Sequence, residues 1–385
     1  VGDKGNYGIE AIYRETLEGR NGCMLRQRIA PGFSSVVHSS DNVDAEDGMD
    51  IVTTLDVDIQ HAADAALRKQ LTEQKASWGT TMVMDVKTGD ILAMVNLGET
   101  SPQSGIYYEK ENYALSRRIE PGSTFKPAVA LIGLQNGIIN TSSYISCNKK
   151  YTRFKDYQPS CLGRHGSINV STAISKSCNC FFFELGYRIG ITNLNKYCKQ
   201  LGLGVKTGVE IGESSGILAG PEYAEKAGKI WQAGDTIQAA IGQSDNNFTP
   251  LQLAQYTATL ASGGKRYQNH LIKSVSSYSL DKMIEDDFVE LLNETEISAD
   301  AYKAVKEGML RVTSDGTAQG TFGKYSIKVA GKTGTAQSPT GIDNAVFIGF
   351  APYDDPEIAI SIVIENGGHG STIAPVAKSI FDAYF

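Results

Sequence analysis

The sequence contains no block of Lys and Arg and no apolar run long enough to cross a lipid bilayer. Its 385 residues include 36 Lys and Arg against 43 Asp and Glu, a net charge of −7. A protein that binds nucleic acid needs a basic surface for the phosphates, so this class is excluded. Internal repeats, low-complexity tracts and a signal peptide are missing too. The first residues, VGDKGNYGIE, indicate a cut end, and we expect an anchor or export segment upstream.

Cysteine is scarce, with six residues in the whole chain. Six cysteines in a chain of this length do not form a disulfide scaffold. Four of them lie close together in the sequence. Cys147, Cys161 and Cys178, with His165, offer three thiols and one imidazole, a ligand set that a closed tetrahedral zinc site accepts. Cys180 competes with Cys178 for the fourth position. Buried free thiols and a single disulfide are the alternatives to a metal site.

Apolar periodicity predicts strands near both ends of the chain and helices between them. The expected strands are part of 51–72, the hairpin 81–85 and 91–95, and 325–336, 345–351 and 358–365. The expected helices are the rest of 51–72, then 128–137, 250–264, 298–312 and 374–385. This order predicts an α+β fold with one antiparallel sheet covered by helices. The polar segment 1–50 is interpreted as an extended stub that leads into a main domain over 51–385.

Serine acyl transfer needs a nucleophile, a nearby base and donors for the oxyanion, and an S-x-x-K pair on a helix supplies the first two. This spacing occurs four times, at Ser123, Ser146, Ser262 and Ser279. Ser123 follows Pro-Gly and precedes the apolar run AVALIGL, which places it at the N-terminus of a buried helix. Lys126 at that apolar helix start should hold its proton weakly, as a base requires. We therefore select Ser123 and Lys126.

K-T-G occurs three times, and context again separates the copies. Lys87 begins the turn of the early hairpin, and Lys206 lies in a glycine-rich loop. The third copy, which begins at Lys332, is predicted to end an alternating strand with sheet partners after it. A strand edge there would pair with an extended peptide.

The S-x-N pattern occurs at Ser177 and at Ser244, among other places. Ser244-Asp245-Asn246 precedes a new helix, where such residues are typical caps. Ser177-Cys178-Asn179 lies between two apolar helical stretches and suits a tight connection that aims small polar groups into a cleft. We favour Ser177 and Asn179. Cys178, the middle residue, would then point away from the cleft, so that a metal bound there would brace the segment from behind.

In this order, EPGSTFKP, SKSCN and VAGKTGTAQ resemble the motifs of class B penicillin-binding proteins. GIEAIYRETLEGRNG resembles the pedestal segment of that family, and WQAGDTIQAAIGQ resembles the elongation type, penicillin-binding protein 2, more than the division type. The resemblance implies a five-stranded antiparallel sheet with helices on both faces and an all-helical lobe. One departure is Ser244, because the family often has Gly after IGQ.

The resemblance also implies a peptidoglycan DD-transpeptidase that acts on D-Ala-D-Ala stem peptides through an acyl-enzyme on Ser123. Lys126 would be the base, Ser177 the proton relay to the leaving amine and Lys332 its assistant. Asn179 would hold the substrate amide. The terminal carboxylate, or a β-lactam mimic, would bind the segment Thr333, Gly334 and Thr335, and the N–H groups of Ser123 and Thr335 would form the oxyanion hole.

Elongation-type relatives can carry zinc at positions that match Cys147, Cys161, His165 and Cys178, so the resemblance supports structural zinc. The chemistry itself needs no cofactor. Expected partners are peptidoglycan stem peptides, β-lactams, a membrane glycosyltransferase and elongation-complex proteins. The expected location is the extracytoplasmic face of the bacterial plasma membrane, with an N-terminal anchor outside this chain.

Other functions share these motifs. A serine β-lactamase must hydrolyse its acyl-enzyme, and the sequence identifies no carboxylate placed to activate the water. A DD-carboxypeptidase differs only in using water as the acceptor. A β-lactam sensor or a wall-assembly scaffold would be the alternatives outside catalysis, and the intact set of Ser123, Lys126 and Lys332 argues against a pure scaffold.

Overall fold

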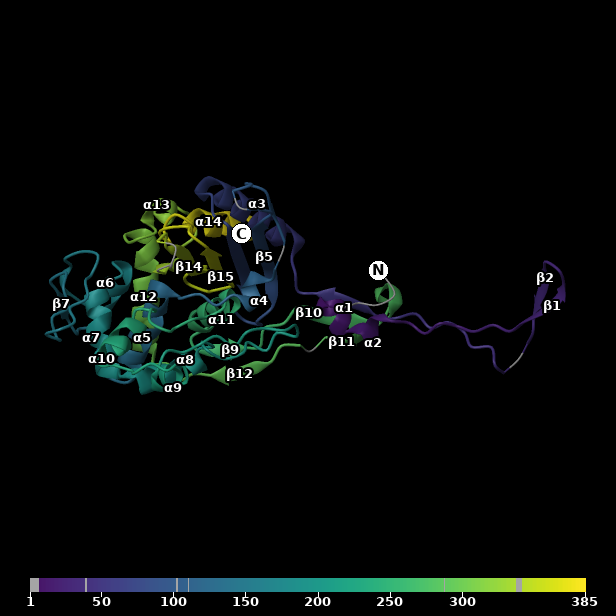
Figure 1. The fold of residues 1–385 in the computed structure, drawn as a ribbon, viewed down its shortest axis with the longest axis horizontal. Coiled ribbons are helices and arrows are strands. Elements are labelled where there is room, and N and C mark those ends of the chain that lie inside the picture. Colours follow the sequence, from purple (N-terminus) through teal and green to yellow (C-terminus); the bar gives the residue numbers. More distant parts are fainter. Residues whose placement is uncertain (1–6, 39, 102, 110, 287, 337–340) are drawn as a thin grey trace. The chain divides into compact units, whose positions relative to one another are not determined.

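The computed structural model describes residues 7–38, 40–101, 103–109, 111–286, 288–336 and 341–385 (Figure 1). The chain forms two compact units. Unit 1 comprises Val1–Thr54 and His270–Phe288, and unit 2 comprises Leu55–Asn269 and Val289–Phe385. Residues 1–6 of the expected stub, and Gln337 at the end of the K-T-G segment, lie outside the described residues. No described helix has both the length and the apolar content needed to span a membrane.

Unit 1 is built from short elements that come from two distant parts of the sequence. Its helices are α1 (Gly8–Ile12), α2 (Arg14–Leu17) and the 3₁₀ turn η2 (Tyr278–Leu280). Its strands are β1 (Arg26–Ala30), β2 (Phe33–Val36), β3 (Asp50–Thr53), β10 (Ile272–Ser276) and β11 (Met283–Glu285). β1 and β2 form an exposed antiparallel hairpin, and β10 lies between β11 and β3 in a second sheet. Residues 270–288 thus return to the segment that precedes the main domain.

The core of unit 2 is an antiparallel sheet. Its strands are β4 (Trp78–Asp85), β5 (Ile91–Glu99), β6 (Tyr107–Tyr108), β13 (Ala330–Ala336), β14 (Asn344–Ala351) and β15 (Ile358–Ile364). Within the described residues their order is β13-β14-β15-β4-β5-β6. The central strands β14 and β15 are almost wholly buried, as expected for strands covered on both faces. β13 is an edge strand, so one side of its backbone has no neighbouring strand in the described part of the chain.

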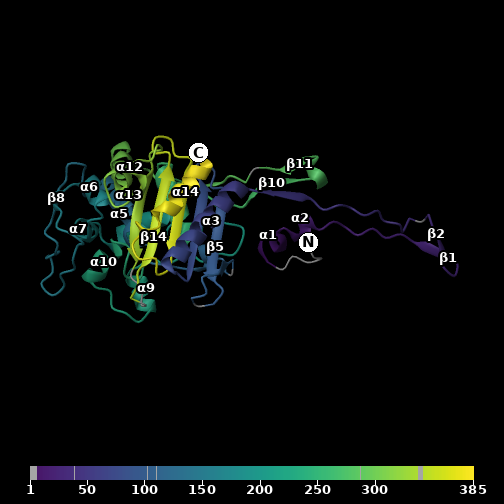
Figure 2. The ribbon, with the colours of Figure 1, turned by 90° about the horizontal axis from the view of Figure 1, so that it is seen from above.

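Helices cover both faces of this sheet (Figures 1 and 2). On one face, α3 (Val57–Gln74) packs beside α14 (Ala374–Tyr384), and Asp56 caps α3 by accepting two backbone N–H groups. On the other, α11 (Pro250–Ala261) crosses β14, β15 and β4. Its residues are all buried, and Thr249 and Gln252 form a capping box at its start.

The remaining elements build a mainly helical lobe beside β13. Its helices are η1 (Gly122–Phe125), α5 (Lys126–Gln135), α6 (Val170–Ser175), α7 (Asn179–Ile189), α8 (Ile191–Gln200), α9 (Pro221–Lys226), α10 (Ala233–Ala239), α12 (Ala299–Ser314) and α13 (Gln319–Phe322). α4 (Tyr113–Ser116) and the short strand pairs β7 (Ile145–Cys147) with β8 (Gly166–Ile168) and β9 (Lys265–Tyr267) with β12 (Leu291–Glu294) complete unit 2. α12 joins lobe to sheet, because it contacts α6, α5 and β13.

The predicted α+β fold is confirmed, with five long strands and the two-residue strand β6 added at the edge. One boundary was wrong. A strand was expected over 325–336, but β13 begins only at Ala330. Tyr325 instead closes a turn, in which its N–H donates to the carbonyl of Phe322. Lys332 therefore lies inside β13 and not at the end of a strand.

Candidate active site

Ser123 lies in the tight turn η1, directly before α5. Gly122 makes this turn possible, because its φ of +52° is unfavourable for other residues and a Cβ there would lie 2.5 Å from the carbonyl oxygen of Thr335. The N–H of Gly122 donates to the carbonyl of Gly242 (2.9 Å). Pro127 occupies the first turn of α5, as predicted. The turn that carries Ser123 therefore packs closely against β13.

Lys126 is fully buried one turn after Ser123. Its Nζ donates to the carbonyl oxygen (2.9 Å) and Oγ (3.1 Å) of Ser177 and to Oδ1 of Asn179 (2.6 Å). Burial lowers its pKa to about 8, although the nearby cysteines oppose this shift. A lysine with this pKa can exist as the neutral amine near neutral pH.

Lys332 is also fully buried and approaches the same serine from β13. Its Nζ donates to Oγ of Ser177 (3.0 Å) and to the carbonyl oxygen of Thr333 (2.8 Å). Burial, and then the charge of Lys126, hold its pKa well below the ordinary value. The two lysines therefore meet at one hydroxyl group.

Ser177 has the unusual backbone that such a position demands. It links α6 to α7 with a φ of +52°, in the left-handed region that costs a non-glycine residue about 1 kcal/mol or more. Its Oγ is within donor distance of both Lys126 and Lys332. A hydroxyl that accepts two hydrogen bonds keeps its own proton for a third partner. The structure thus brings together the predicted Ser177, Asn179 and both lysines.

A cleft of about 440 Å³ opens above these groups. Of the predicted residues, Ser123, Ser177, Asn179, Thr333 and Thr335 line it. Gly334 lies at the back of β13, where a Cβ would come within 2.7 Å of the carbonyl of Pro121. β13 therefore borders the cleft at close range to the turn that carries the serine.

Sequence reasoning missed several residues that line the cleft. They include Leu162, Phe183, Gln238, Thr317, Asp343 and His369. Thr317 contacts Thr333, with 2.6 Å between their Oγ1 atoms. Gly370, the neighbour of His369, packs so tightly on β13 that a Cβ would lie 2.3 Å from the carbonyl of Gly334. Phe183 and Gln238 lie in α7 and α10, and the other four lie outside helices and strands. None of the six belongs to a recognised motif, so no local pattern signals them.

The rejected S-x-N copy has a different role from the one expected. Thr249, not Ser244 or its neighbours, caps α11. Ser244 has a φ of +68°, a conformation in which glycine is at ease, and Asp245 forms an ion pair with Lys229 (2.6 Å). Asn246 bonds to backbone groups of Ala219 and Ala239. The loop follows Gly242, whose carbonyl accepts the N–H of Gly122 in the turn that carries Ser123.

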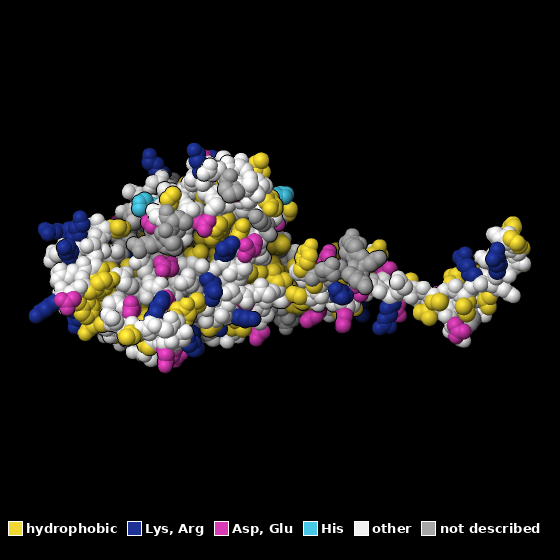
Figure 3. Space-filling model, in the orientation of Figure 1, with side chains coloured by type: hydrophobic (Ala, Val, Ile, Leu, Met, Phe, Trp, Pro, Cys, Tyr) yellow, Lys and Arg dark blue, Asp and Glu magenta, His cyan; other side chains and the backbone are white. Residues whose placement is uncertain are grey.

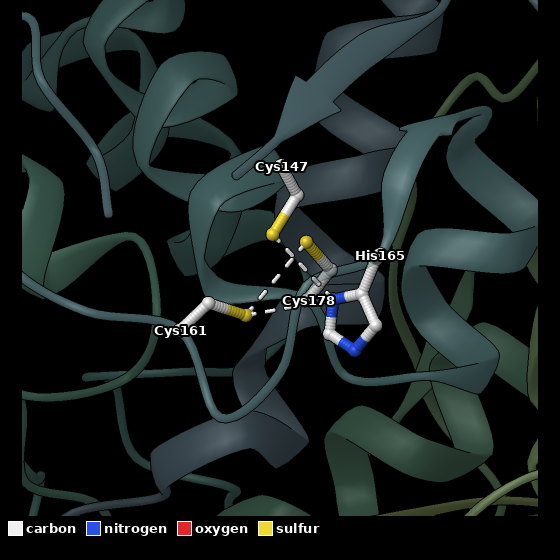
Figure 4. A group of neighbouring side chains, drawn as sticks. All are labelled: Cys147, Cys161, His165 and Cys178. Atoms are coloured by element: carbon white, nitrogen blue, oxygen red, sulfur yellow. Dashed lines mark hydrogen bonds between the residues drawn. The ribbon is translucent and has the colours of Figure 1, made fainter. Parts of the chain in front are cut away.

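The predicted ligands Cys147, Cys161, His165 and Cys178 gather behind Ser177, with all four ligand atoms within 4.8 Å of one another (Figure 4). Nδ1 of His165 lies 3.6 Å from Sγ of Cys147 and 3.5 Å from Sγ of Cys161, and the sulfurs of Cys161 and Cys178 are 3.9 Å apart. Cys180 does not belong to this group. A tetrahedral Zn²⁺ with Zn–S bonds of about 2.3 Å holds its ligands about 3.8 Å apart, so the set fits zinc.

The cluster connects directly to the catalytic segment. The backbone N–H of Asn179 donates to Sγ of Cys161 (3.2 Å), and Cys178 stands between Ser177 and Asn179. All six cysteines of the chain are free thiols in this structure, which leaves no disulfide to hold the segment. The pKa of Cys161 is lowered, first by hydrogen bonds from the thiols of Cys178 and Cys180, which favours the thiolate that a metal binds.

Comparison with known proteins identifies the family. The family model described as penicillin-binding protein transpeptidase domain matches residues 79–383, and the chain belongs to this family. Among curated proteins, the peptidoglycan D,D-transpeptidase MrdA of Acinetobacter baumannii is 31% identical over 98% of this chain and 60% of its own length. The chain thus spans about 60% of that relative.

Solved structures agree with the family. The crystal structure of Pseudomonas aeruginosa PBP2 in complex with WCK 5153 has a TM-score of 0.79 at 29% identity and covers 99% of this chain and 83% of that one. Helicobacter pylori PBP2, solved in a complex with MreC, has a TM-score of 0.82 at 25% identity and covers 98% and 71%. The predicted resemblance to penicillin-binding protein 2 is confirmed.

Proposed function

We propose that this chain is the catalytic part of a peptidoglycan DD-transpeptidase that works through an acyl-enzyme on Ser123. The observation that carries the proposal is the Oγ of Ser177, which lies within hydrogen-bond distance of both Lys126 and Lys332 under the cleft. The family match and the transpeptidases among its relatives support the reaction class. The extended stem peptide would lie along the open edge of β13.

Acylation would begin when neutral Lys126 accepts the proton of Ser123 as its oxygen attacks the carbonyl carbon of the penultimate D-Ala. The developing oxyanion would be held by the backbone N–H groups of Ser123 and Thr335. Ser177 would then pass its proton to the nitrogen of the terminal D-Ala, the C–N bond would break, and D-Ala would leave. A proton from Lys126 or Lys332 would restore the Ser177 hydroxyl. Asn179 and Thr333 would orient the substrate.

In the second half, the amine of an acceptor stem would attack the acyl carbon and give one proton to the base. The ester bond to Ser123 would then break, and the base would pass that proton to the Ser123 oxygen, which leaves the new amide and the free hydroxyl. A carboxypeptidase or a β-lactamase would use water instead. Asp343 is the carboxylate that lines the cleft among the described residues, so hydrolysis has a named group to test. Rapid turnover of penicillin, abolished by Asp343→Asn, would favour the hydrolytic alternative.

Covalent labelling with a fluorescent penicillin tests the proposal. We expect one label per chain in the wild type and none in Ser123→Ala, because the nucleophile is gone. Ser262→Ala is a matched control, since Ser262 begins another S-x-x-K sequence outside the cleft, and it should label normally. Labelling that persists in Ser123→Ala would refute the assignment.

We also propose that Cys147, Cys161, His165 and Cys178 hold a structural zinc ion. The fit of the ligand spacing supports this, and so does the bond from Asn179 to Cys161. When bound, the metal would supply no chemistry to the reaction. The four ligands would instead fix the left-handed connection at Ser177 from behind.

Metal analysis of the purified protein tests the zinc proposal. We expect about one equivalent of zinc in the wild type and a loss of most of it in Cys161→Ala, because three ligands bind zinc far more weakly than four. Cys198→Ala changes a buried thiol outside the cluster and should retain the metal. A wild-type content below about 0.1 equivalents would contradict the proposal.

The remaining expectations concern the longer protein. We propose that residues 1–50 belong to a pedestal, that 51–385 is the transpeptidase domain and that an N-terminal anchor holds it on the extracytoplasmic face of the plasma membrane. A membrane glycosyltransferase and elongation-complex proteins are the proposed partners. The Helicobacter pylori relative solved with MreC supports a partner of the second kind.

A further inference from the structure

The loop between β7 and β8, residues 148–165, is strongly basic in an otherwise acidic chain. It carries five Lys and Arg against one Asp, a net charge of +4. Since the whole chain carries −7, the remaining residues carry −11. Figure 3 shows Lys and Arg side chains gathered at the end of unit 2 where β7 lies. We call residues 148–165 the basic loop.

Four of the five cations in the basic loop have no acidic partner among the residues that the structure describes. Lys149, Lys150, Lys155 and Arg164 are exposed, and none of them forms an ion pair with a carboxylate of the described residues. Lys149 also has a φ of +74°, which lysine seldom adopts. Their mutual repulsion is therefore uncompensated within the described part of the chain.

The basic loop is nevertheless firmly attached to the lobe. Tyr151 is buried, and its hydroxyl donates to Oε2 of Glu184 on α7 (2.8 Å). The fifth cation, Arg153, pairs with the same carboxylate (3.4 Å) and lies 3.9 Å from the ring centre of Tyr187. The N–H of Cys161 donates to the carbonyl of Lys149 (2.6 Å). These contacts hold the backbone of the basic loop in one conformation, so its charged side chains extend from an ordered segment.

The same loop forms one wall of the catalytic cleft. Pro159, Ser160 and Leu162 line the cleft, and Leu162 is 81% exposed. Tyr157 reaches across to α10, where its hydroxyl accepts a hydrogen bond from Nε2 of the cleft residue Gln238. The loop that carries the cations therefore also borders the cleft.

We propose that the basic loop binds the carboxylate-bearing stem peptides of a peptidoglycan strand and holds that polyanion beside the cleft. This inference rests on the function proposed above, because a transpeptidase must retain polymeric strands of which only the stem ends enter the cleft. Several unpaired cations spread over one loop match a repeating anion better than a single charge. Such a surface raises the local concentration and the association rate of its partner in a salt-dependent way.

Charge reversal tests the inference in the purified chain. The test variant is Lys149→Glu/Lys150→Glu/Lys155→Glu. The matched control is Lys75→Glu/Lys199→Glu/Lys324→Glu, which changes the net charge equally at exposed lysines elsewhere in unit 2. The probes are soluble uncross-linked peptidoglycan strands with free carboxylates and the same strands with amidated carboxylates.

We expect the test variant to bind the free-carboxylate strands about tenfold more weakly than the wild type in ~20 mM salt, with the difference nearly gone at ~0.5 M. The control variant should bind like the wild type, and amidated strands should bind the wild type as weakly as the free strands bind the test variant. Labelling of Ser123 by a fluorescent penicillin should be unchanged in both variants, because none of the six lysines touches the reacting atoms.

Equal binding by the test and control variants, or equal binding of amidated and free strands, would overturn the inference. So would a wild type that prefers phosphatidylglycerol vesicles to strands and loses that preference in the test variant, because the loop would then be a membrane surface. If penicillin labels Ser123 while strand binding ignores the loop charges, this inference alone fails. If penicillin does not label the wild type, the proposed function fails.

Discussion

Lys126 sets the pH dependence of the proposed acylation, because it must be neutral to accept the proton of Ser123. Its pKa is lowered to about 8 by burial. Burial, and then the charge of Lys126, also hold the pKa of Lys332 well below its ordinary value. The acylation rate should therefore rise about tenfold for each pH unit below about 8 and then level off. Labelling rates measured with a fluorescent penicillin between pH ~6 and ~9.5 check this.

Substitution isolates the contribution of Lys126. Lys126→Met should lower the acylation rate at least about 100-fold, because general-base catalysis contributes on this scale. Lys265→Met, in the S-x-x-K sequence that begins at Ser262, should leave the rate unchanged. If the acylation rate of the wild type did not change between pH ~6 and ~9.5, a group other than Lys126 would accept the proton.

At the scale of single residues, the sequence predicted the central groups because each choice depended on local context. A Pro-Gly entry and an apolar helix separated Ser123 from three other serines with the same spacing. Thr317 and His369 could not be found this way, because tertiary folding alone brings their loops to the cleft. The left-handed backbone of Ser177 is also invisible in the letters, since serine gives no sign of positive φ.

At the scale of elements, strands and helices were predictable where apolar residues repeat over a long stretch. α11 and β15 are buried along their whole lengths, and both were expected. The predicted start of β13 was too early. Residues 325–329 alternate as a strand would, but in the structure they form the connection between α13 and β13. Periodicity reports which residues face the core, and it does not report where sheet pairing begins.

The helical lobe shows the same contrast between what the sequence predicts and what only the folded structure reveals. The ligand types of the cysteine cluster could be read from composition, and the structure then placed their atoms within 4.8 Å. The charge of the basic loop can be counted from the sequence, although its cations form no continuous block. Its position against the cleft cannot be read there, because that depends on the anchoring of Tyr151 to α7 and on the contact of Tyr157 with α10.

At the scale of the whole molecule, the return of residues 270–288 to unit 1 was not foreseen. β10 pairs with β3 although more than 200 residues separate them, for example at Val275 and Ile51. Local pattern carries no information about pairing at this range, and each strand is too short to suggest its partner. The structure divides the chain into two units, and each of them is discontinuous in sequence.

Glu120 gives global stability a pH dependence of its own. Burial, and then the charge of Asp245, raise its pKa from 4.5 to about 7. The folded state thus binds this proton more tightly than the unfolded state. The resulting stability is fully present below pH 4.5 and is lost as the pH rises to about 7. Lys229 forms an ion pair with Asp245. The charge of Asp245 nevertheless still raises the pKa of Glu120.

Glu120→Gln removes the penalty at high pH, because the amide carries no charge to bury. At pH ~8 the variant should be more stable than the wild type by about 1 kcal/mol, a figure reduced for the partial exposure of the group. Near pH ~4.5 the two should unfold alike, because Glu120 is protonated in the folded wild type. Glu296→Gln, at an exposed glutamate of unit 2, should shift neither value. Urea unfolding at both pH values measures the difference, and a gain that is the same at each would mean that the charge of Glu120 is already solvated in the folded protein.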